Sequence, residues 1–262
     1  MRTGILGTLT IGQAPRPDVV PIIDRHVPER VRRIHRGVLD GLSHAEIAAR
    51  YLAEPGEAAL VTRLNDGRVV ELSRSRMLVG VRQALRRLEA DGCDVILILC
   101  TGTFEGLQCE RAWLVEPDHI IPATVAGLVE KRQLGVIVPI ASQIDSERDK
   151  WRPLARPPLF AAVSPYSDGP EAVLATGERL QAEGAEAVLL DCTGFTERHR
   201  NTLAALDMPV ILSNALVAKA VGELFGGWER GCATRDRRGD VAHPPRMQAD
   251  RSGRSCVKSP ST

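Results

Sequence analysis

Two cysteines in this sequence occur in the same local context. Cys100 and Cys192 each follow a short run of Val, Ile and Leu, and each is followed by Thr and Gly. Such runs are typical of buried parallel strands, and open α/β sheets bind ligands at the carboxyl ends of these strands. The positive end of a following helix lowers the pKa of a thiol placed there. A single such cysteine is usually a small apolar packing residue, but two in matched contexts indicate functional thiols.

The loop after the first predicted strand, residues 10–18, is the second candidate region. Gly12 lets the backbone approach a ligand, and the side chains of Gln13 and Arg16 are suited to holding a carboxylate. The same residues also fit an ordinary strand-to-helix turn, with Pro17 near the start of the helix. The GxGxxG pattern of dinucleotide-binding loops is absent here, so the loop does not predict a nucleotide site.

His199 lies seven residues after Cys192, two helical turns along nearly the same face. In that position it would reach toward the thiol or a substrate carboxylate, although a charged, solvent-facing helix also explains residues 197–200. The remaining histidines have no spacing that indicates a metal or a triad. Cys93 is expected to pack at the start of a strand, and Cys109 to pack on a helix. Residues 138–139, 164–166 and 213–214 are further strand ends expected at the same edge.

The elements that must position these residues form an α/β pattern. Apolar runs without alternation predict strands at residues 4–11, 94–99, 134–138, 159–163, 187–190 and 209–212. Helical spacing predicts helices over residues 74–90 and 169–183, each ended by a nearby glycine. Ser43 and Glu46 form a capping-box pattern that opens a helix towards Tyr51. Residues 65–67, Asn-Asp-Gly, predict the turn of a small β-hairpin within residues 60–72.

Composition excludes several classes of protein. The 262 residues carry a net charge of +1 and only 3% aromatic side chains, so nothing indicates binding to nucleic acid or to a membrane surface. The longest apolar run, residues 95–99, is too short to span a bilayer, and the N-terminus lacks the pattern of a signal peptide. Six cysteines without paired spacing predict a reducing, cytoplasmic location. Residues 227–262 are basic, rich in Arg, Gly and Ser, and expected to be disordered.

Three stretches resemble the AroM family: residues 9–16, residues 54–67 with their Glu-Pro-Gly-Glu and Leu-Asn-Asp-Gly motifs, and residues 191–200. The resemblance spans about residues 1–225. The family in turn looks like a branch of the aspartate/glutamate racemase superfamily, whose members have two similar Rossmann-like α/β lobes that each offer one cysteine to a cleft. The resemblance implies a first lobe of residues 1–117 with a returning segment 211–226, and a second lobe of residues 118–210.

By this resemblance, one thiolate removes the proton α to a carboxylate while the opposite thiol returns a proton to the other face, without cofactor or metal. The product is a racemised or isomerised small carboxylate. Cys100 and Cys192 match the catalytic positions. The expected substrate-binding residues are Thr10, Gln13, Arg16, Thr101, Gly102, Thr103, Thr193, Gly194 and His199.

The sequence also departs from the superfamily pattern. Thr10 and Gln13 stand in the first-strand loop where Asp-Ser types are common, and Gly194 stands where a second-lobe side chain normally acts, unless His199 replaces it. Two alternatives therefore stay open: a non-catalytic binding or regulatory protein for a small carboxylate, and a one-thiol isomerase or decarboxylase. Whether the chain forms a homo-oligomer is also open.

Overall fold

The computed structural model describes residues 3–226, which form two α/β lobes, each built on a four-stranded parallel sheet. The predicted tail, residues 227–262, lies outside the described residues. The first sheet has the order β2-β1-β5-β6 and the second the order β10-β9-β7-β8. The strands of the first sheet are β1 (Ile5–Thr10), β2 (Arg32–Gly37), β5 (Val95–Leu99) and β6 (Trp113–Val115). Those of the second are β7 (Leu134–Val138), β8 (Leu159–Ala162), β9 (Ala187–Leu190) and β10 (Val210–Leu212).

The two sheets repeat one topology. If the strands of each lobe are numbered along the chain, both sheets run in the order 2-1-3-4. The direction of strand addition reverses between the first and third strands, and ligands of open α/β sheets bind at the carboxyl edge beside such a switch point. The third strands are β5 and β9, and they lead directly into Cys100 and Cys192. The chain repeat therefore brings each cysteine to the same place in its own lobe.

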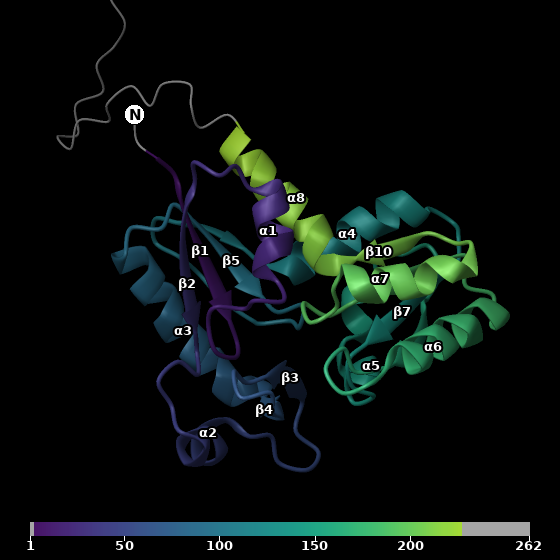
Figure 1. The fold of residues 1–262 in the computed structure, drawn as a ribbon, viewed down its shortest axis with the longest axis horizontal. Coiled ribbons are helices and arrows are strands. Elements are labelled where there is room, and N and C mark those ends of the chain that lie inside the picture. Colours follow the sequence, from purple (N-terminus) through teal and green to yellow (C-terminus); the bar gives the residue numbers. More distant parts are fainter. Residues whose placement is uncertain (1–2, 227–262) are drawn as a thin grey trace, which may run out of the picture. The chain divides into compact units, whose positions relative to one another are not determined.

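Helices cover both faces of the first sheet, because successive side chains of β5 point to opposite faces and are apolar on both. Leu97 and Leu99 pack in one core cluster with α1 (Val20–His26), α4 (Pro117–Val129) and α8 (Ser213–Gly226). Ile96, Ile98 and Cys100 pack in the other with α2 (His44–Tyr51) and α3 (Arg74–Ala90), which lies on the side of the sheet away from α1 and α8 (Figure 1).

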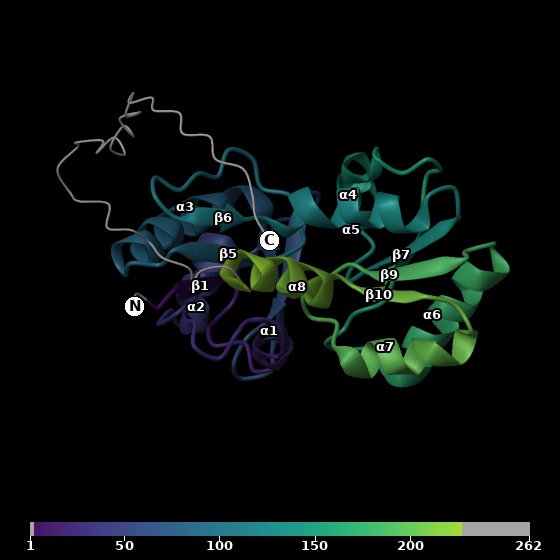
Figure 2. The same ribbon diagram turned by 90° about the horizontal axis from the view of Figure 1, so that it is seen from above.

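The second lobe has α6 (Pro170–Ala182) and α7 (Glu197–Leu203) packed against each other on one face of its sheet (Figure 2). The short helix α5 (Gln143–Ser146) and the 3₁₀ helix η1 (Arg148–Trp151) follow β7, and a second 3₁₀ turn, η2 (Ala204–Leu206), precedes β10. The last helix, α8, packs on α1 and α4. None of the helices within residues 3–226 has the length and apolar character that crossing a membrane requires.

The predicted hairpin is confirmed as β3 (Ala59–Arg63) and β4 (Val69–Ser73), which pair antiparallel. It lies with α2 at the end of the first lobe where β1 and β5 finish (Figure 1). The capping box before α2 is also confirmed: the Ser43 hydroxyl accepts from the Glu46 amide, and the Glu46 carboxylate accepts from the Ser43 amide at 2.8 Å. These two features follow from local chemistry that needs no tertiary partner.

Several details differ from the sequence-based expectations, which included neither strand β2 nor the three-residue strand β6. The strand β2, Arg-Arg-Ile-His-Arg-Gly, has no apolar run, because it is an edge strand whose side chains are mostly only partly buried. Cys109 does not lie on a helix; residues 105–112 form irregular structure between β5 and β6. The helical spacing around Cys109 lacked a capping residue and a sustained apolar stripe, so it was a weak basis for a helix.

Candidate active site

The loops after β5 and β9 contain the two cysteines, and both thiols are buried. Cys100 is 7% exposed and Cys192 is 6% exposed. The thiol of Cys192 accepts a hydrogen bond from the Gly194 amide at 3.4 Å, and the thiol of Cys100 accepts one from the Gly102 amide. Because each glycine stands two residues after its cysteine, the Cys-Thr-Gly sequence produces the same local contact twice.

The threonines that follow the cysteines join the two lobes. Thr101 donates its hydroxyl hydrogen to the carbonyl of Asp191 at 3.2 Å, and Thr193 donates its own to the carbonyl of Leu99, also at 3.2 Å. Each acceptor immediately precedes the cysteine of the other lobe. These reciprocal bonds place the two cysteine loops side by side. They also occupy the hydroxyl hydrogens that the sequence analysis assigned to substrate binding.

The pKa of both thiols is raised, mainly by burial, whereas the lowering expected from the positive end of a following helix does not occur. That of Cys100 rises to about 12: burial is the main cause, negative charge on Cys192 and on Glu147 contributes, and the Gly102 amide and Lys150 oppose the rise. That of Cys192 rises to about 11, because the Gly194 amide, Arg16 and the Tyr166 hydroxyl partly offset burial. The two thiols are close enough to influence each other electrostatically, and Cys192 is the more acidic.

Arg16 is the cation beside Cys192. Its side chain is 5% exposed and binds Asp18 through two bonds, from Nε at 2.9 Å and from Nη2 at 2.7 Å. Nη2 also donates to the Tyr166 hydroxyl at 3.3 Å. Burial opposes the charge of Arg16, but Asp18 and Tyr166 outweigh it and raise its pKa, so it stays protonated. Arg16 therefore lies where predicted, yet its Nε and Nη2 atoms already have partners.

Tyr166 lies between two arginines and against the second cysteine loop. The guanidinium groups of Arg16 and Arg63 lie 5.9 Å and 5.7 Å from its ring centre. Burial is the main reason that its pKa is raised, so the hydroxyl remains a donor toward Cys192. A side chain at position 194 would collide with the Tyr166 ring, so this position requires glycine.

Thr10 and Gln13 both accept hydrogen bonds from backbone amides. The Thr10 hydroxyl accepts from the Gly12 amide at 3.2 Å, and the Gln13 side chain accepts from the Asn65 amide at 2.9 Å. A side chain at Gly12 would meet Thr62 of the hairpin, so the close approach that this glycine permits is to β3. The first-strand loop is thus closed over by the hairpin, which the sequence analysis predicted but did not place.

His199 caps α7. Its Nδ1 accepts from the Thr196 amide at 2.9 Å, and its ring packs edge-on against Phe195 with centres 5.3 Å apart. Burial is the main cause that lowers its pKa, followed by the charge of Arg198. The ring borders a cavity of about 350 Å³ that Arg63, Tyr166 and Gly194 also line. His199 therefore stands near the second loop but is held by the start of its own helix.

Buried charges that the sequence analysis did not single out surround the first loop. Thr103 donates to Glu147 at 3.4 Å, and Glu147, 2% exposed, also pairs with Arg74 at the start of α3. Lys150 of η1 contacts both cysteine loops. No local pattern identified these residues, because they come from a short 3₁₀ helix and a helix start whose sequences look like solvent-facing turns.

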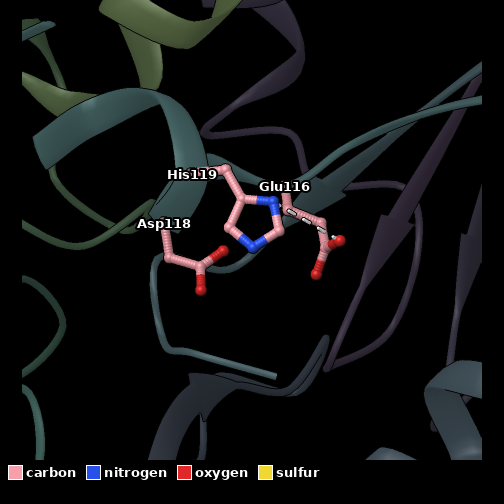
Figure 3. A group of neighbouring side chains, drawn as sticks. All are labelled: Glu116, Asp118 and His119. Carbon is pink, nitrogen blue, oxygen red and sulfur yellow. Dashed lines mark ion pairs between the residues drawn. The ribbon is translucent and has the colours of Figure 1, made fainter. Parts of the chain in front are cut away.

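Glu116, Asp118 and His119 gather at the start of α4 (Figure 3). One ligand atom from each lies within 4.8 Å of the others, as a metal site requires. Burial raises the pKa of both carboxyl groups, and Asp118 also faces Thr103 and Lys150. The positive end of α4 stabilises these carboxylates and disfavours an added cation. We therefore regard this group as part of the helix start.

The second loop is supported from behind by α8. Asn214 donates through Nδ2 to the carbonyls of Thr193 and Phe195, at 3.0 Å and 2.7 Å, and Ser213 donates to the Cys192 carbonyl at 3.4 Å. Residues 213–214 were expected at this edge from the sequence. They hold the Cys192 loop through its backbone, which leaves the conformation of the thiol and its neighbouring amides fixed before any ligand binds.

Comparison with known proteins gives the family and the fold. The family model described as AroM protein matches residues 6–225. Glutamate racemase from Bacillus anthracis is similar in structure, with a TM-score of 0.57 and 15% identity over 84% of this chain and 81% of its own. Picrophilus torridus aspartate racemase has a TM-score of 0.55 and 15% identity over 85% and 94%.

Unliganded arylmalonate decarboxylase has a TM-score of 0.54 and 13% identity over 86% of this chain and 94% of its own. At such identities these likenesses concern the fold. No curated protein matches the sequence. Because the family model covers most of the chain, the protein belongs to the AroM family.

Proposed function

We propose that the protein is a racemase or isomerase of a small carboxylate, in which Cys100 and Cys192 form an acid–base pair. The reciprocal bonds between the two Cys-Thr-Gly loops carry this proposal, because they bring two buried thiols from equivalent places in two lobes into electrostatic contact. Two thiols so arranged suit a reaction in which one group removes a proton and the other supplies one.

In the proposed reaction the Cys192 thiolate removes the proton α to the substrate carboxylate, and the C–H electron pair moves into the carboxylate to form an enediolate. The Cys100 thiol then delivers its proton to the other face of the same carbon. Cys192 ends protonated and Cys100 ends as thiolate, so the reverse direction uses the same groups with exchanged roles. The steps transfer only protons and need no electron acceptor.

Cys192 is the more readily ionised thiol of the resting protein. Arg16, the Gly194 amide and the Tyr166 hydroxyl favour its thiolate and Asp191 opposes it, whereas beside Cys100 the Gly102 amide and Lys150 favour ionisation and Glu147 opposes it. The hydroxyls of Thr101 and Thr193 are engaged with the opposite lobe, and Arg16 with Asp18. We therefore assign carboxylate binding chiefly to backbone amides of the two loops, which are fixed in place and can stabilise the enediolate.

Substrate entry requires a movement, because both thiols are less than a tenth exposed. Opening must break the bonds that cross between the lobes, such as those of Thr101 and Thr193, and closing must form them again around the substrate. Closure of this kind excludes water from the enediolate and completes the set of donors.

The inequality of the two thiols also supports a second candidate, a one-thiol isomerase or decarboxylase. Only Cys192 has both a cation and a phenol beside it. In that case Cys192 protonates or attacks the substrate, and Cys100 only lines the site. The two candidates differ in whether the Cys100 thiol is required.

The deciding experiment is proton NMR in D₂O with reduced protein and a panel of chiral amino, hydroxy and aryl carboxylates, together with aryl malonates. We expect α-proton exchange with the native chain and none with the Cys100→Ala, Cys192→Ala double variant. Cys109→Ala, a cysteine outside the two loops, is the matched control and should behave as the native chain. Ligand-dependent thermal stabilisation that survives in the double variant, without exchange by the native protein, would contradict catalysis and indicate a binding protein.

A further inference from the structure

Lys150 is a buried cation that lies between the two cysteine loops. Its side chain is 8% exposed, although lysine is rarely buried without a specific partner. Its Nζ lies 2.6 Å from Oδ2 of Asp191, 3.0 Å from the carbonyl oxygen of Thr101 and 3.5 Å from Oε2 of Glu147. A buried ammonium group has three donor directions, and here each direction has an oxygen.

The partners of Lys150 are the immediate neighbours of the cysteines. Thr101 follows Cys100, and Asp191 precedes Cys192. Thr101 and Asp191 are also joined directly, through the Thr101 hydroxyl and the Asp191 carbonyl. One ammonium group therefore closes a ring of contacts that includes both loops, and its own chain segment, η1, adds a third element to that ring.

We propose that Lys150 is a positioning residue that fixes the Cys100 and Cys192 loops relative to each other and balances the negative charge between them. This set of contacts between Lys150 and the two cysteine loops, here called the clamp, is a property of the fold. Its consequence for turnover rests on the function proposed above, and the two are tested separately.

Buried carboxylates surround the ammonium group of Lys150 and keep it protonated. Asp191, Glu147 and Asp118 face it, Glu147 is shared with Arg74, and the Trp151 ring lies 5.3 Å from Nζ. Within residues 3–226 neither carboxylate oxygen of Asp191 accepts a conventional hydrogen bond, so the ion pair with Lys150 is the main compensation for that buried carboxylate. Burial opposes the charge of Lys150, but Asp191 and Glu147 raise its pKa, so it stays protonated and cannot serve as a base.

Removing this positive charge should make both thiols harder to ionise. Lys150 acts directly on Cys100, and its loss leaves Asp191 uncompensated next to Cys192. Lys150→Met keeps the length of the side chain and removes its charge and its hydrogen bonds. Lys150→Gln keeps a donor for Thr101 without the charge, and Lys150→Arg keeps the charge. Lys131→Met, an exposed lysine after α4, is the control.

The test is a pH titration of the full chain labelled with ¹³Cβ-cysteine, the Cys100 and Cys192 signals being assigned by Cys→Ser variants. For Lys150→Met and Lys150→Gln we expect the thiolate fraction of Cys100 at a given pH to fall about tenfold, which moves its ionisation midpoint to higher pH. Lys150→Arg should restore most of the native midpoint, and Lys131→Met should leave it unchanged. A lysine with only a structural role would not give this order of Cys100 ionisation midpoints among the variants.

Turnover supplies the second readout. With a substrate found by NMR, Lys150→Met should lower kcat about tenfold while KM changes little, since the ammonium group acts on the thiols. Folded Lys150→Met and Lys150→Gln proteins with native thiol midpoints would overturn the inference. If Lys150→Met does not fold, Lys150→Gln alone decides it. Shifted midpoints in a protein without any exchange activity would support the clamp and refute the proposed function.

Discussion

The two Cys-Thr-Gly loops share their sequence and their backbone contacts but have different neighbours. Each thiol accepts a hydrogen bond from the backbone amide of the glycine two residues later. The threonine of each loop donates a hydrogen bond to a backbone carbonyl of the other lobe. Beside Cys192 the chain places Arg16 and Tyr166, whereas beside Cys100 it places Glu147 and Lys150.

The difference shows how a repeated motif can give two unequal acids. The motif itself supplies the sulfur and one amide donor, and this contribution is the same in both lobes. The neighbouring side chains come from segments outside the motif that differ in sequence between the lobes: the loop after β1, the segment after β7 that includes η1, and the loop after β8. Burial raises the pKa of both thiols, to about 11 at Cys192 and about 12 at Cys100, and the charges and donors of these segments modify it.

The largest expected effect comes from removing one thiol at a time. Cys192→Ala and Cys100→Ala should each lower the rate of racemisation by about 10²- to 10⁴-fold, the usual contribution of an acid–base group. They should differ in α-proton exchange, because each variant keeps the thiol for only one face of the carbon. Chiral chromatography and NMR of both substrate enantiomers in D₂O measure this. If Cys100→Ala keeps native rates in every assay, the one-thiol candidate is favoured.

A smaller effect should follow from removing the cation beside Cys192. Arg16→Met with Asp18→Asn removes the buried ion pair as a whole, which avoids leaving a lone charge. We expect the ionisation midpoint of Cys192 to rise by about one unit while that of Cys100 stays near its native value. The ¹³Cβ-cysteine titration measures both in one sample. Equal shifts at the two thiols would contradict the assignment of Arg16 to Cys192.

The difference between the pKa values of the two thiols should also appear in how the free energy of unfolding depends on alkaline pH. In the unfolded chain a thiol has a pKa of about 8.5, whereas in the folded protein the pKa of Cys192 is about 11 and that of Cys100 is about 12. The folded state therefore binds more protons above pH 8.5, and its stability, complete below that pH, falls as pH rises toward both folded values. Each thiol contributes up to about 1.4 kcal/mol per pH unit.

Urea unfolding of reduced protein at several pH values tests this linkage. Cys100→Ala should flatten the alkaline decline over a wider pH range than Cys192→Ala, because its folded pKa is higher. Cys93→Ala, a buried cysteine away from both loops, corrects for the remaining thiols, since burial raises the pKa of Cys93 to about 11. A steeper decline in either loop variant than in the native chain would refute the assignment.

The smallest effect concerns the symmetric part of the comparison. Thr101→Val and Thr193→Val each remove one hydrogen bond between the lobes, and each should lower the free energy of unfolding by about 1 kcal/mol. Because both bonds join the same two loops, the loss of unfolding free energy in the double variant should differ from the sum of the two single losses. Thr176→Val, which removes an exposed bond within α6, is the control. Strict additivity would mean that the two bonds act independently.

Local sequence chemistry was enough to find most elements and the two loops. The apolar runs of β1, β5, β7 and β9, the capping box at Ser43 and the Asn-Asp-Gly turn depend on neighbours within a few residues, so their patterns were readable. The two edge strands of the first sheet were not predicted, because an edge strand such as β2 need not be apolar and β6 is only three residues long.

The sequence by itself determined that two thiols would stand at the ends of two equivalent strands, because strand periodicity and the repeated Cys-Thr-Gly motif are local properties. Only the tertiary structure decided what surrounds each thiol. Lys150 reaches Asp191 across 41 residues and Arg16 reaches Tyr166 across 150, and no pattern along the chain encodes such pairs. Burial and those distant charges set the acidity of each thiol, and with it the role that we assign to each.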